Sequence, residues 1–545
     1  MTKYSRPHSG VNDESTFDYI VVGGGSAGCV LANRLTEDGS ATVCLIEAGE
    51  RAKGWSPHMP AAMLKTCFRA DLNWGFKSEP EPALHDRQLN VLRGKVIGGS
   101  SQINGMVYVR GDRHDYDDWS ALGCKGWSYS DVLPYFRRAE NSWTGETRAR
   151  GGTGPLGVNI SDSPSLRFND FRQAAINAGY PAMDRIDSDE PEGVTPTEMT
   201  VGRDGRRAST WLAYLRPALS RRNLMLTSGA VSSGIVIEGK RAVGVEYARG
   251  GQRVRVRANR EVILASGSYG SPQLLLLSGI GPAQELRALG IEPVLDLPGV
   301  GRNLTDHPMM YMNFRARPRT FADELRFDRA AVSALRWALF GSGPFATNGV
   351  AAQIFCRTDP DWNRADVQMS CLAVDMHAGI WFPLAKKPVH GLSVALMMIR
   401  SDSRGKVSLR SANYAEPPRI FFNLMQERSD VERMIRAMHA VREVYAQEPL
   451  RSLVIKETIP GSAFVTDDQL EQVIREQCTI AEHPISTCKM GVDEDAVVSP
   501  ELKVHGIEGL RVADASVMPT IPTGNTNAPV IMIAEKAADH IRGRL

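Results

Sequence analysis

The sequence predicts an α/β protein, α+β overall, and three observations support this. Near the N-terminus, a short apolar strand, a glycine-rich turn, a helix and a second apolar strand follow one another. Further along, alternating segments such as Arg253–Arg257 are typical of antiparallel strands. Between about residues 311 and 474, strand-like and helical segments mix without a glycine fingerprint. We therefore expect one domain built on parallel strands and a second domain built on an antiparallel sheet.

The first three elements form a βαβ unit. Phe17–Val22 is rich in β-branched and aromatic residues, which favours a strand. The run from Cys29 to Gly39 places its apolar residues at helical spacing. Ala41–Ile46 reads as a second strand. This order predicts a Rossmann-like nucleotide-binding fold.

The turn of this unit carries a dinucleotide fingerprint. Gly23, Gly25 and Gly28 allow a tight turn, close approach to a pyrophosphate and close packing of helix on strand. Glu47 follows Gly28 by 47 − 28 = 19 residues, at the position expected to bind ribose hydroxyls. The alternative is an ordinary βα turn followed by a surface glutamate. The unit by itself does not separate NAD from FAD, because an acid binds the ribose of both.

Later elements extend this architecture. Val243–Tyr247 is expected to pair with Arg253–Arg257, and Glu261–Ala265 reads as a buried strand. Ser429–Tyr445 has the apolar spacing of an amphipathic helix. Pro529 suits the first turn of a C-terminal helix.

Composition excludes some classes of function. Apolar residues make up 42% of the 545 residues and charged residues 23%, which indicates a globular chain. The formal net charge of +2 argues against nucleic-acid binding, which requires a basic excess or stripe.

The sequence favours the cytoplasm. None of the eight cysteines forms a C-x-x-C pair, and no set of Cys and His has zinc-like spacing, so free thiols and no metal are expected. The first residues lack the apolar core of a signal peptide, and no apolar stretch reaches the ~18 to 20 residues that span a bilayer. Peripheral contact with a membrane stays open.

Five longer motifs extend the argument from about residue 16 to the C-terminus. They resemble signatures of the glucose–methanol–choline (GMC) flavin oxidoreductase family, of the choline dehydrogenase and aryl-alcohol oxidase type. The motifs are GKVIGGSSQINGMVYVRGDRHDYD (94–117), GSYGSPQLLLLSGIG (267–281), GVGRNLTDHP (299–308), HPISTCKMG (483–491) and VADASVMPTIPTGNTNAPVIMIAEKAAD (512–539).

The resemblance implies FAD and a discontinuous arrangement. The FAD-binding domain would comprise residues 16–155, 216–310 and 475–545, with a cap segment at 156–215 and a substrate domain at 311–474. The GGSS loop agrees, because successive backbone N–H groups can form an anion nest, although a flexible loop is the alternative. The cofactor-binding residues implied are Gly23, Gly25, Ser26, Ala27, Gly28, Glu47, Ala48, Trp74, Arg93, Gly94, Val96, Gly99, Ser100, Asn104, Gly105, Met106, Val107, Val231, Ser266, Gly267, Asp514, Ala515, Asn525 and Thr526.

One departure from the family concerns the flavin linkage. Some members attach the flavin covalently to a histidine just before the asparagine that matches Asn104. Ile103 stands there and has no nucleophile. The FAD is therefore expected to be non-covalent.

The resemblance also implies a catalytic pair. His483 matches the general base, and Asn527 is expected to match its partner, which donates a hydrogen bond to the alcohol oxygen. His483 would take the hydroxyl proton while a hydride passes to flavin N5.

The residues that contact the substrate are predicted less directly than those that bind the cofactor. Met106, Val374, Met376 and Trp381 are expected to line the substrate site, which suits an aromatic or aliphatic alcohol. Glu482 directly precedes His483. It either contacts a cationic or polar substrate or forms a salt bridge with a neighbouring side chain, and we favour the salt bridge. Choline is less favoured because no aromatic cage for a quaternary ammonium is visible.

The expected reaction is oxidation of a primary alcohol to the aldehyde, with oxygen or a quinone-type compound as electron acceptor. The alternatives are a flavin-containing hydroxynitrile lyase and a choline-type dehydrogenase. A non-catalytic flavin-binding protein is a further alternative, against which His483 and its asparagine argue.

Overall fold

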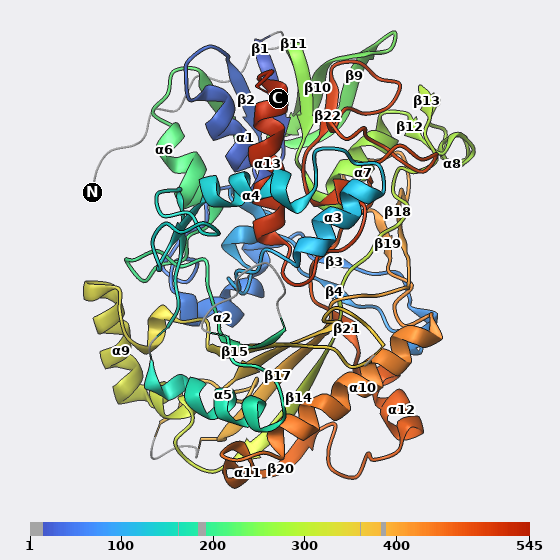
Figure 1. The fold of residues 1–545 in the computed structure, drawn as a ribbon. Helices are drawn as coiled ribbons and strands as arrows, with labels where there is room; N and C mark the ends of the chain where they lie inside the picture. The colour runs from blue at the N-terminus through green and yellow to red at the C-terminus, as the bar shows by residue number, and fades with distance from the viewer. Residues whose placement is uncertain (1–14, 162, 184–191, 360, 383–387, 545) are drawn as a thin grey trace.

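The computed structural model describes residues 15–161, 163–183, 192–359, 361–382 and 388–544 (Figure 1). Two large sheets dominate it, one in the upper half of the view in Figure 1 and one in the lower half. The first is largely parallel and the second antiparallel, which confirms the predicted fold class. The N-terminal residues on which the expectation of no signal peptide rests lie outside the described part.

The first sheet has a parallel half and an antiparallel half. Its order is β8-β2-β1-β11-β10-β9, and β22 also pairs with β11. The strands β8, β2, β1, β11 and β22 are parallel neighbours, whereas β11, β10 and β9 form an antiparallel meander. The strands are β1 (Thr16–Val22), β2 (Val43–Ile46), β8 (Leu224–Thr227), β9 (Val231–Glu238), β10 (Arg241–Arg249), β11 (Gln252–Leu264) and β22 (Leu510–Val512).

The sequence predicted β1, β2, β10 and β11 with small errors at their ends. The two strands expected at Arg253–Arg257 and Glu261–Ala265 form one continuous strand, β11. Its first half pairs with the charged β10 hairpin and its second half is buried against β1, which explains the change of pattern along it. The helix α1 (Ser26–Thr36) begins inside the glycine turn, three residues before the expected start.

Helices cover the first sheet. The helix α1 packs against α13 (Asn527–Ile541), which in turn packs against α4 (Tyr129–Ala139). Buried apolar residues of these helices and of β1, β2 and β11 form the largest core of the described residues. The other helices of this region are α2 (Met63–Cys67), α3 (Arg113–Ala121), α6 (Arg216–Ala218), α7 (Gly267–Leu277) and α8 (Ala283–Ala288).

The second sheet is antiparallel throughout. Its order is β20-β14-β17-β16-β15-β7, and β21 pairs with the start of β14. The strands are β7 (Gly193–Pro196), β14 (Pro308–Ala316), β15 (Val350–Cys356), β16 (Val367–Leu372), β17 (Gly391–Met398), β20 (Val454–Ile459) and β21 (Thr479–Ile480). The strand β7 comes from the expected cap segment, so this segment adds an edge strand to the second sheet.

Helices also flank the second sheet. The helix α10 (Arg428–Tyr445) packs on β17, and α5 (Phe168–Asn177) packs on β15 and β7. The remaining helices here are α9 (Phe327–Phe340), α11 (Leu450–Leu453) and α12 (Asp467–Gln477). Four two-stranded sheets pair β3 (Phe76–Lys77) with β4 (Asn90–Val91), β5 (Glu140–Ser142) with β6 (Leu156–Val158), β12 (Ile280–Gly281) with β13 (Leu295–Asp296), and β18 (Lys406–Ser408) with β19 (Arg419–Phe421). The five segment boundaries expected from the sequence stay a prediction.

Candidate active site

The carboxyl ends of the parallel strands gather the predicted binding residues. Val22, Ile46 and Leu264 are neighbours across β1, β2 and β11, so the residues that follow them emerge at one edge. Val512 of β22 lies beside Leu264 and brings Asp514 to the same edge. This edge is where open α/β sheets bind ligands.

Glycine backbones pack directly on one another beneath this edge. A Cβ on Gly28 would lie 1.8 Å from the Gly23 carbonyl oxygen, and one on Gly99 would lie 2.7 Å from the Gly25 Cα. A Cβ on Gly94 would in turn lie 2.4 Å from the carbonyl carbon of Gly99. Side chains there would push the layers apart, so the glycines bring the first turn and the GGSS loop into contact.

Glu47 is held in the position expected for a ribose acid. The backbone N–H groups of Gly24 and Gly49 donate to its two carboxylate oxygens, each over 2.7 Å. Burial raises its pKa to about 7, while these two hydrogen bonds oppose that shift. A carboxyl group that is buried but still lines a cavity is suited to accept hydrogen bonds from ligand hydroxyls.

A cavity of about 620 Å³ runs along this edge and reaches the second sheet. It lies within the size range of cofactor sites, ~300–1,000 Å³. Apart from four residues, every site residue predicted from the sequence lines it. The exceptions are Gly28, which lies under the turn, Val96, Val374 and Trp381.

These four residues have structural positions. Val96 is fully buried in a small apolar cluster with Ile103. Val374 packs against the core of the second sheet, and Trp381 donates its indole N–H to the carbonyl of Ala322. Val374 and Trp381 were therefore wrong as lining residues, because the segment after β16 turns them away from the cavity.

The residues present fit an FAD molecule. The glycine layers leave the Gly25 backbone facing the cavity, where a Cβ would meet nothing closer than 4.0 Å. The N-terminus of α1 begins at Ser26 and so offers backbone N–H groups to a pyrophosphate. Glu47 and His483 both line the cavity. Ile103 also lines the cavity and presents only carbon to it.

His483 is held at both ring nitrogens. The amide nitrogen of Asn525 lies 3.1 Å from Nε2, and Nδ1 of His307 lies 3.0 Å from Nδ1 of His483. The backbone N–H of His483 donates to Asp306 over 2.9 Å. The imidazole is therefore fixed in position and orientation.

Hydrogen-bond directions fix the tautomer of His483. The side-chain N–H of Gln368 donates to Oδ1 of Asn525 (3.2 Å) and to Oε1 of Gln353 (2.9 Å). Asn525 consequently turns its NH₂ group toward Nε2 of His483, which must accept. In the neutral ring the proton then lies on Nδ1 and is donated to Nδ1 of His307.

Burial keeps the two histidines neutral. The pKa of His483 lies well below its ordinary value because the ring is buried, and His307 and the cationic Arg93 lower it further. Burial lowers the pKa of His307 to about 3. Burial also raises the pKa of Asp306 to about 8, with the nearby charge of Glu482 adding to the rise.

The structure corrects the expected partner of His483. Asn525, which was expected only to bind the cofactor, faces Nε2 of His483. Asn527, the expected partner, accepts a hydrogen bond from the Ser26 hydroxyl at Oδ1 over 2.8 Å. Asn525 lies before α13 and Asn527 is its first residue, so the start of the helix directs the two side chains to different neighbours.

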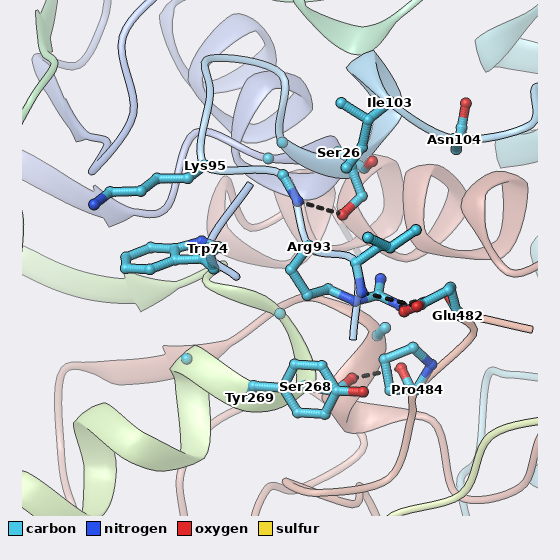
Figure 2. Close-up of a pocket in the computed structure, with 18 of the residues that line it drawn as sticks. Ser26, Trp74, Arg93, Lys95, Ile103, Asn104, Ser268, Tyr269, Glu482 and Pro484 are labelled. Atoms are coloured by element: carbon cyan, nitrogen blue, oxygen red, sulfur yellow. Dashed lines mark hydrogen bonds and ion pairs between the residues drawn. The ribbon is translucent and has the colours of Figure 1, made fainter. Parts of the chain in front are cut away.

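Glu482, next to His483 in sequence, pairs with Arg93 (Figure 2). The ion pair measures 2.9 Å, and the backbone N–H of Leu92 donates to the other carboxylate oxygen over 2.8 Å. The Arg93 guanidinium lies 5.6 Å from the centroid of the Tyr269 ring. Trp74 lies nearby in Figure 2, with the Lys95 amine 4.8 Å from the centroid of its ring. The charge of Glu482 is thus neutralised by the protein.

The wall contributed by the second sheet and α2 is largely apolar. It is rich in methionine and aliphatic side chains, with Tyr311 and Ser370 among the few polar groups. The lining residues from these segments are Met63, Leu64, Cys67, Met309, Tyr311, Val350, Ser370, Leu372, Ala395 and Met397, and Met106, Val107 and Met376 line the cavity from loops. Both predicted methionines, Met106 and Met376, are among them.

Sequence reasoning missed two polar residues of the site. His307 stands in the recognised GVGRNLTDHP motif, and its place beside Asp306 at the start of β14 was the available signal. Gln368 is fully buried in the otherwise apolar strand β16. A buried glutamine in such a strand needs hydrogen-bond partners. The sequence therefore indicates that such partners exist, but it does not identify them.

Two classes of site are absent among the described residues. No group of His, Cys, Asp and Glu there is arranged to hold a metal ion. No helix in that part of the chain is long and apolar enough to cross a membrane.

Comparison with known proteins agrees with this geometry. The GMC oxidoreductase family models match residues 17–309 and 401–534. An oxygen-dependent choline dehydrogenase of Brucella canis is 44% identical over 533 residues, covering 97% of this chain and 96% of the relative. Its counterpart in Sinorhizobium fredii is 43% identical over 530 residues, with the same coverage.

Solved structures also resemble this fold. A pyridoxine 4-oxidase from Mesorbium loti has a TM-score of 0.84 and 29% identity, with 96% of this chain and 98% of that chain covered. A variant of formate oxidase from Aspergillus oryzae RIB40 has a TM-score of 0.90 and 27% identity, with 98% and 99% covered. The chain therefore belongs to the GMC oxidoreductase family and is an FAD-dependent oxidoreductase that acts on CH–OH groups.

Proposed function

We propose that the protein oxidises a neutral, largely apolar primary alcohol to the aldehyde, with His483 as the general base. The observation that carries this proposal is the convergence of Nε2 of His483 and the Asn525 amide at 3.1 Å on a largely apolar cavity. Bound FAD supplies the acceptor for the hydride of the alcohol carbon.

The two side chains have complementary roles toward one oxygen atom. An alcohol hydroxyl placed between them donates its proton to Nε2 of His483 and accepts a hydrogen bond from the Asn525 amide. The lowered pKa of His483 supports this assignment, because a neutral imidazole has a free lone pair for the proton. Asn525 stabilises the charge that develops on the oxygen as the proton leaves.

His307 is proposed as a positioning residue. It accepts from Nδ1–H of His483 and so keeps the basic lone pair on Nε2, toward the substrate. The chain Gln353–Gln368–Asn525 does the same for the amide on the other side. Asn527 is not proposed as a catalytic residue, since its Oδ1 is occupied by Ser26.

The charges of the cavity support a neutral substrate. A quaternary ammonium is recognised by aromatic faces or by an unpaired carboxylate. Glu482, the acidic lining residue beside His483, is already paired with Arg93. Choline remains the second candidate, because relatives at 44% identity are oxygen-dependent choline dehydrogenases.

The proposal includes non-covalent FAD and an acceptor that is oxygen or a quinone-type compound. Ile103 faces the cavity without a nucleophilic atom, which supports a non-covalent cofactor. Denaturation followed by filtration tests this directly: free FAD is expected in the filtrate, and flavin retained on the protein would contradict it.

The decisive experiment is anaerobic reduction of the holoenzyme by paired alcohols. Choline and its uncharged carbon isostere 3,3-dimethyl-1-butanol differ only in charge, so the ratio of their second-order rate constants for flavin reduction isolates the electrostatic preference. We expect the neutral alcohol to bleach the flavin faster. Faster reduction by choline would replace the proposal by a choline-type dehydrogenase, and no bleaching by any alcohol would favour a lyase. Reoxidation by oxygen and by a quinone then separates the two acceptors.

A further inference from the structure

The outer face of α9 carries an unusual set of exposed apolar side chains. Five large residues on this helix are between 52% and 74% exposed: Phe327, Val332, Leu335, Leu339 and Phe340. Val332, Leu335 and Leu339 follow the i, i+3, i+7 spacing of a single helix face. Soluble proteins rarely leave such a contiguous face uncovered.

This face lies outside the buried apolar clusters of the described residues. The opposite side of α9 buries Ala330 and Trp337 against Met59 and Phe345. Figure 1 shows α9 at the left outer edge of the molecule, to the left of α2. The helix is thus anchored by one face while the other points away from the core.

A second segment enlarges the surface. Phe382 stacks on Phe327 with ring centroids 4.8 Å apart, and Ile380 is 60% exposed. We call these seven residues the α9 patch: Phe327, Val332, Leu335, Leu339, Phe340, Ile380 and Phe382.

The segments around the α9 patch also line the substrate cavity. Met376 lines the cavity four residues before Ile380. On α2, Leu64 lines the cavity and is 39% exposed, while the nearby Phe68 is 68% exposed. The segment 59–62 just before α2 packs on α9 in the cluster of Met59 and Trp337. The cavity therefore has an exposed lining residue, Leu64, on a segment that adjoins α9.

Cationic side chains flank this apolar surface. Arg329 and Arg336 on α9 are exposed, and neither pairs with a carboxylate among the described residues. Lys65 on α2 is exposed as well. Arginine and lysine beside Phe and Leu are typical of surfaces that lie in the headgroup region of anionic membranes.

We propose that the α9 patch docks the enzyme on the surface of an anionic lipid bilayer, with the substrate cavity opening toward the lipid. The role in substrate supply rests on the proposed function, since a neutral apolar alcohol partitions into lipid and enters from there. The docking itself is independent of the reaction.

The test is flotation of the holoenzyme with vesicles. Phosphatidylcholine vesicles with and without phosphatidylglycerol are compared for wild type and for the Leu335→Glu/Leu339→Glu double variant. Val465→Glu is the matched control, because Val465 is 64% exposed, Leu339 is 65% exposed, and Val465 lies outside the patch before α12. We expect wild type and the control to float with anionic vesicles, and the double variant to bind at least about tenfold more weakly. High salt should weaken the binding of wild type.

Three outcomes would overturn the proposal. These are wild type that stays unbound to anionic vesicles, a double variant that floats as well as wild type, and a wild-type dimer that the double variant converts to a monomer. The double variant must retain its flavin and its rate with a short water-soluble alcohol. If it loses flavin, Val332→Glu replaces it. Failure of every alcohol to reduce the flavin would refute the proposed function while leaving the flotation result valid.

Discussion

Replacing His307 with leucine removes the group that accepts the Nδ1 proton of His483. The two Nδ1 atoms are 3.0 Å apart, and His307 is fully buried, so water is not at hand to replace the acceptor. His483 then either keeps an unpaired Nδ1–H or moves the proton to Nε2. In the second case two donors face each other, Nε2–H of His483 and the side-chain NH₂ group of Asn525. If the Asn525 amide rotates to present its oxygen instead, it loses the hydrogen bond that it accepts from Gln368.

The size of the effect follows from the unpaired group. Leaving a buried donor without a partner costs about 1–3 kcal/mol. If this whole cost raises the free energy of the His483 tautomer whose Nε2 can accept the proton, the rate of flavin reduction decreases by a factor of about 5 to 150. Loss of a partner that orients a metal-bound histidine has a similar effect, ~10–100-fold.

Anaerobic stopped-flow reduction by a saturating alcohol measures this rate directly. We expect His307→Leu to decrease the limiting reduction rate by ~10–100-fold, with little change in the apparent Kd of the alcohol. His307→Asn should recover most of the rate, because its side-chain oxygen can accept the same proton. The ¹⁵N shifts of His483 should show the proton on Nδ1 in wild type and in His307→Asn.

Two results would refute the reasoning. One is a His307→Leu enzyme that reduces its flavin at the wild-type rate. The other is an equal decrease of the reduction rate in His307→Leu and His307→Asn while the tautomer of His483 stays the same in both. That result would indicate that His307 only packs against His483.

Three further predictions concern the cofactor cradle, the ion pair and the base. Gly99→Ala should lower the flavin content of the purified protein, seen in the ratio of flavin to protein absorbance, because the new Cβ would lie 2.7 Å from the neighbouring glycine turn; full flavin content would contradict the packing argument. Glu482→Gln should lower the free energy of unfolding by about 1–3 kcal/mol, since Arg93 loses the charged hydrogen-bond partner of a pair whose side chains are only 19% and 24% exposed. The control Glu432→Gln, from an exposed pair, should cost ~0–1 kcal/mol, and equal effects would refute the distinction. The reduction rate should not decrease as the pH falls from about 7 to about 6, because the lowered pKa of His483 keeps the ring neutral, whereas Asp306, with a pKa of about 8, titrates mainly above this range; a rate that halves near pH 6.5 would show an unshifted histidine.

Local patterns were enough to predict the nucleotide-binding half of the fold. The strand Phe17–Val22, the glycine turn and Glu47 are consecutive in sequence, and their spacing is set by short-range backbone geometry. The boundaries were less accurate where tertiary pairing decides them. The strand β11 continues through a change of pattern because it has different neighbours along its length.

By itself the sequence determined the α/β class, the cofactor cradle and the candidate base His483, because each is encoded by residue type at short, fixed spacing. Only the tertiary structure decided which asparagine meets that base, because Asn525 and Asn527 are two residues apart and differ only in the direction that the start of α13 gives them. It also decided that His307, 176 positions before His483, contacts its ring, that Glu482 is paired with Arg93, and that Trp381 points away from the cavity. These contacts join segments distant in sequence, so their geometry depends on the packing of the whole chain.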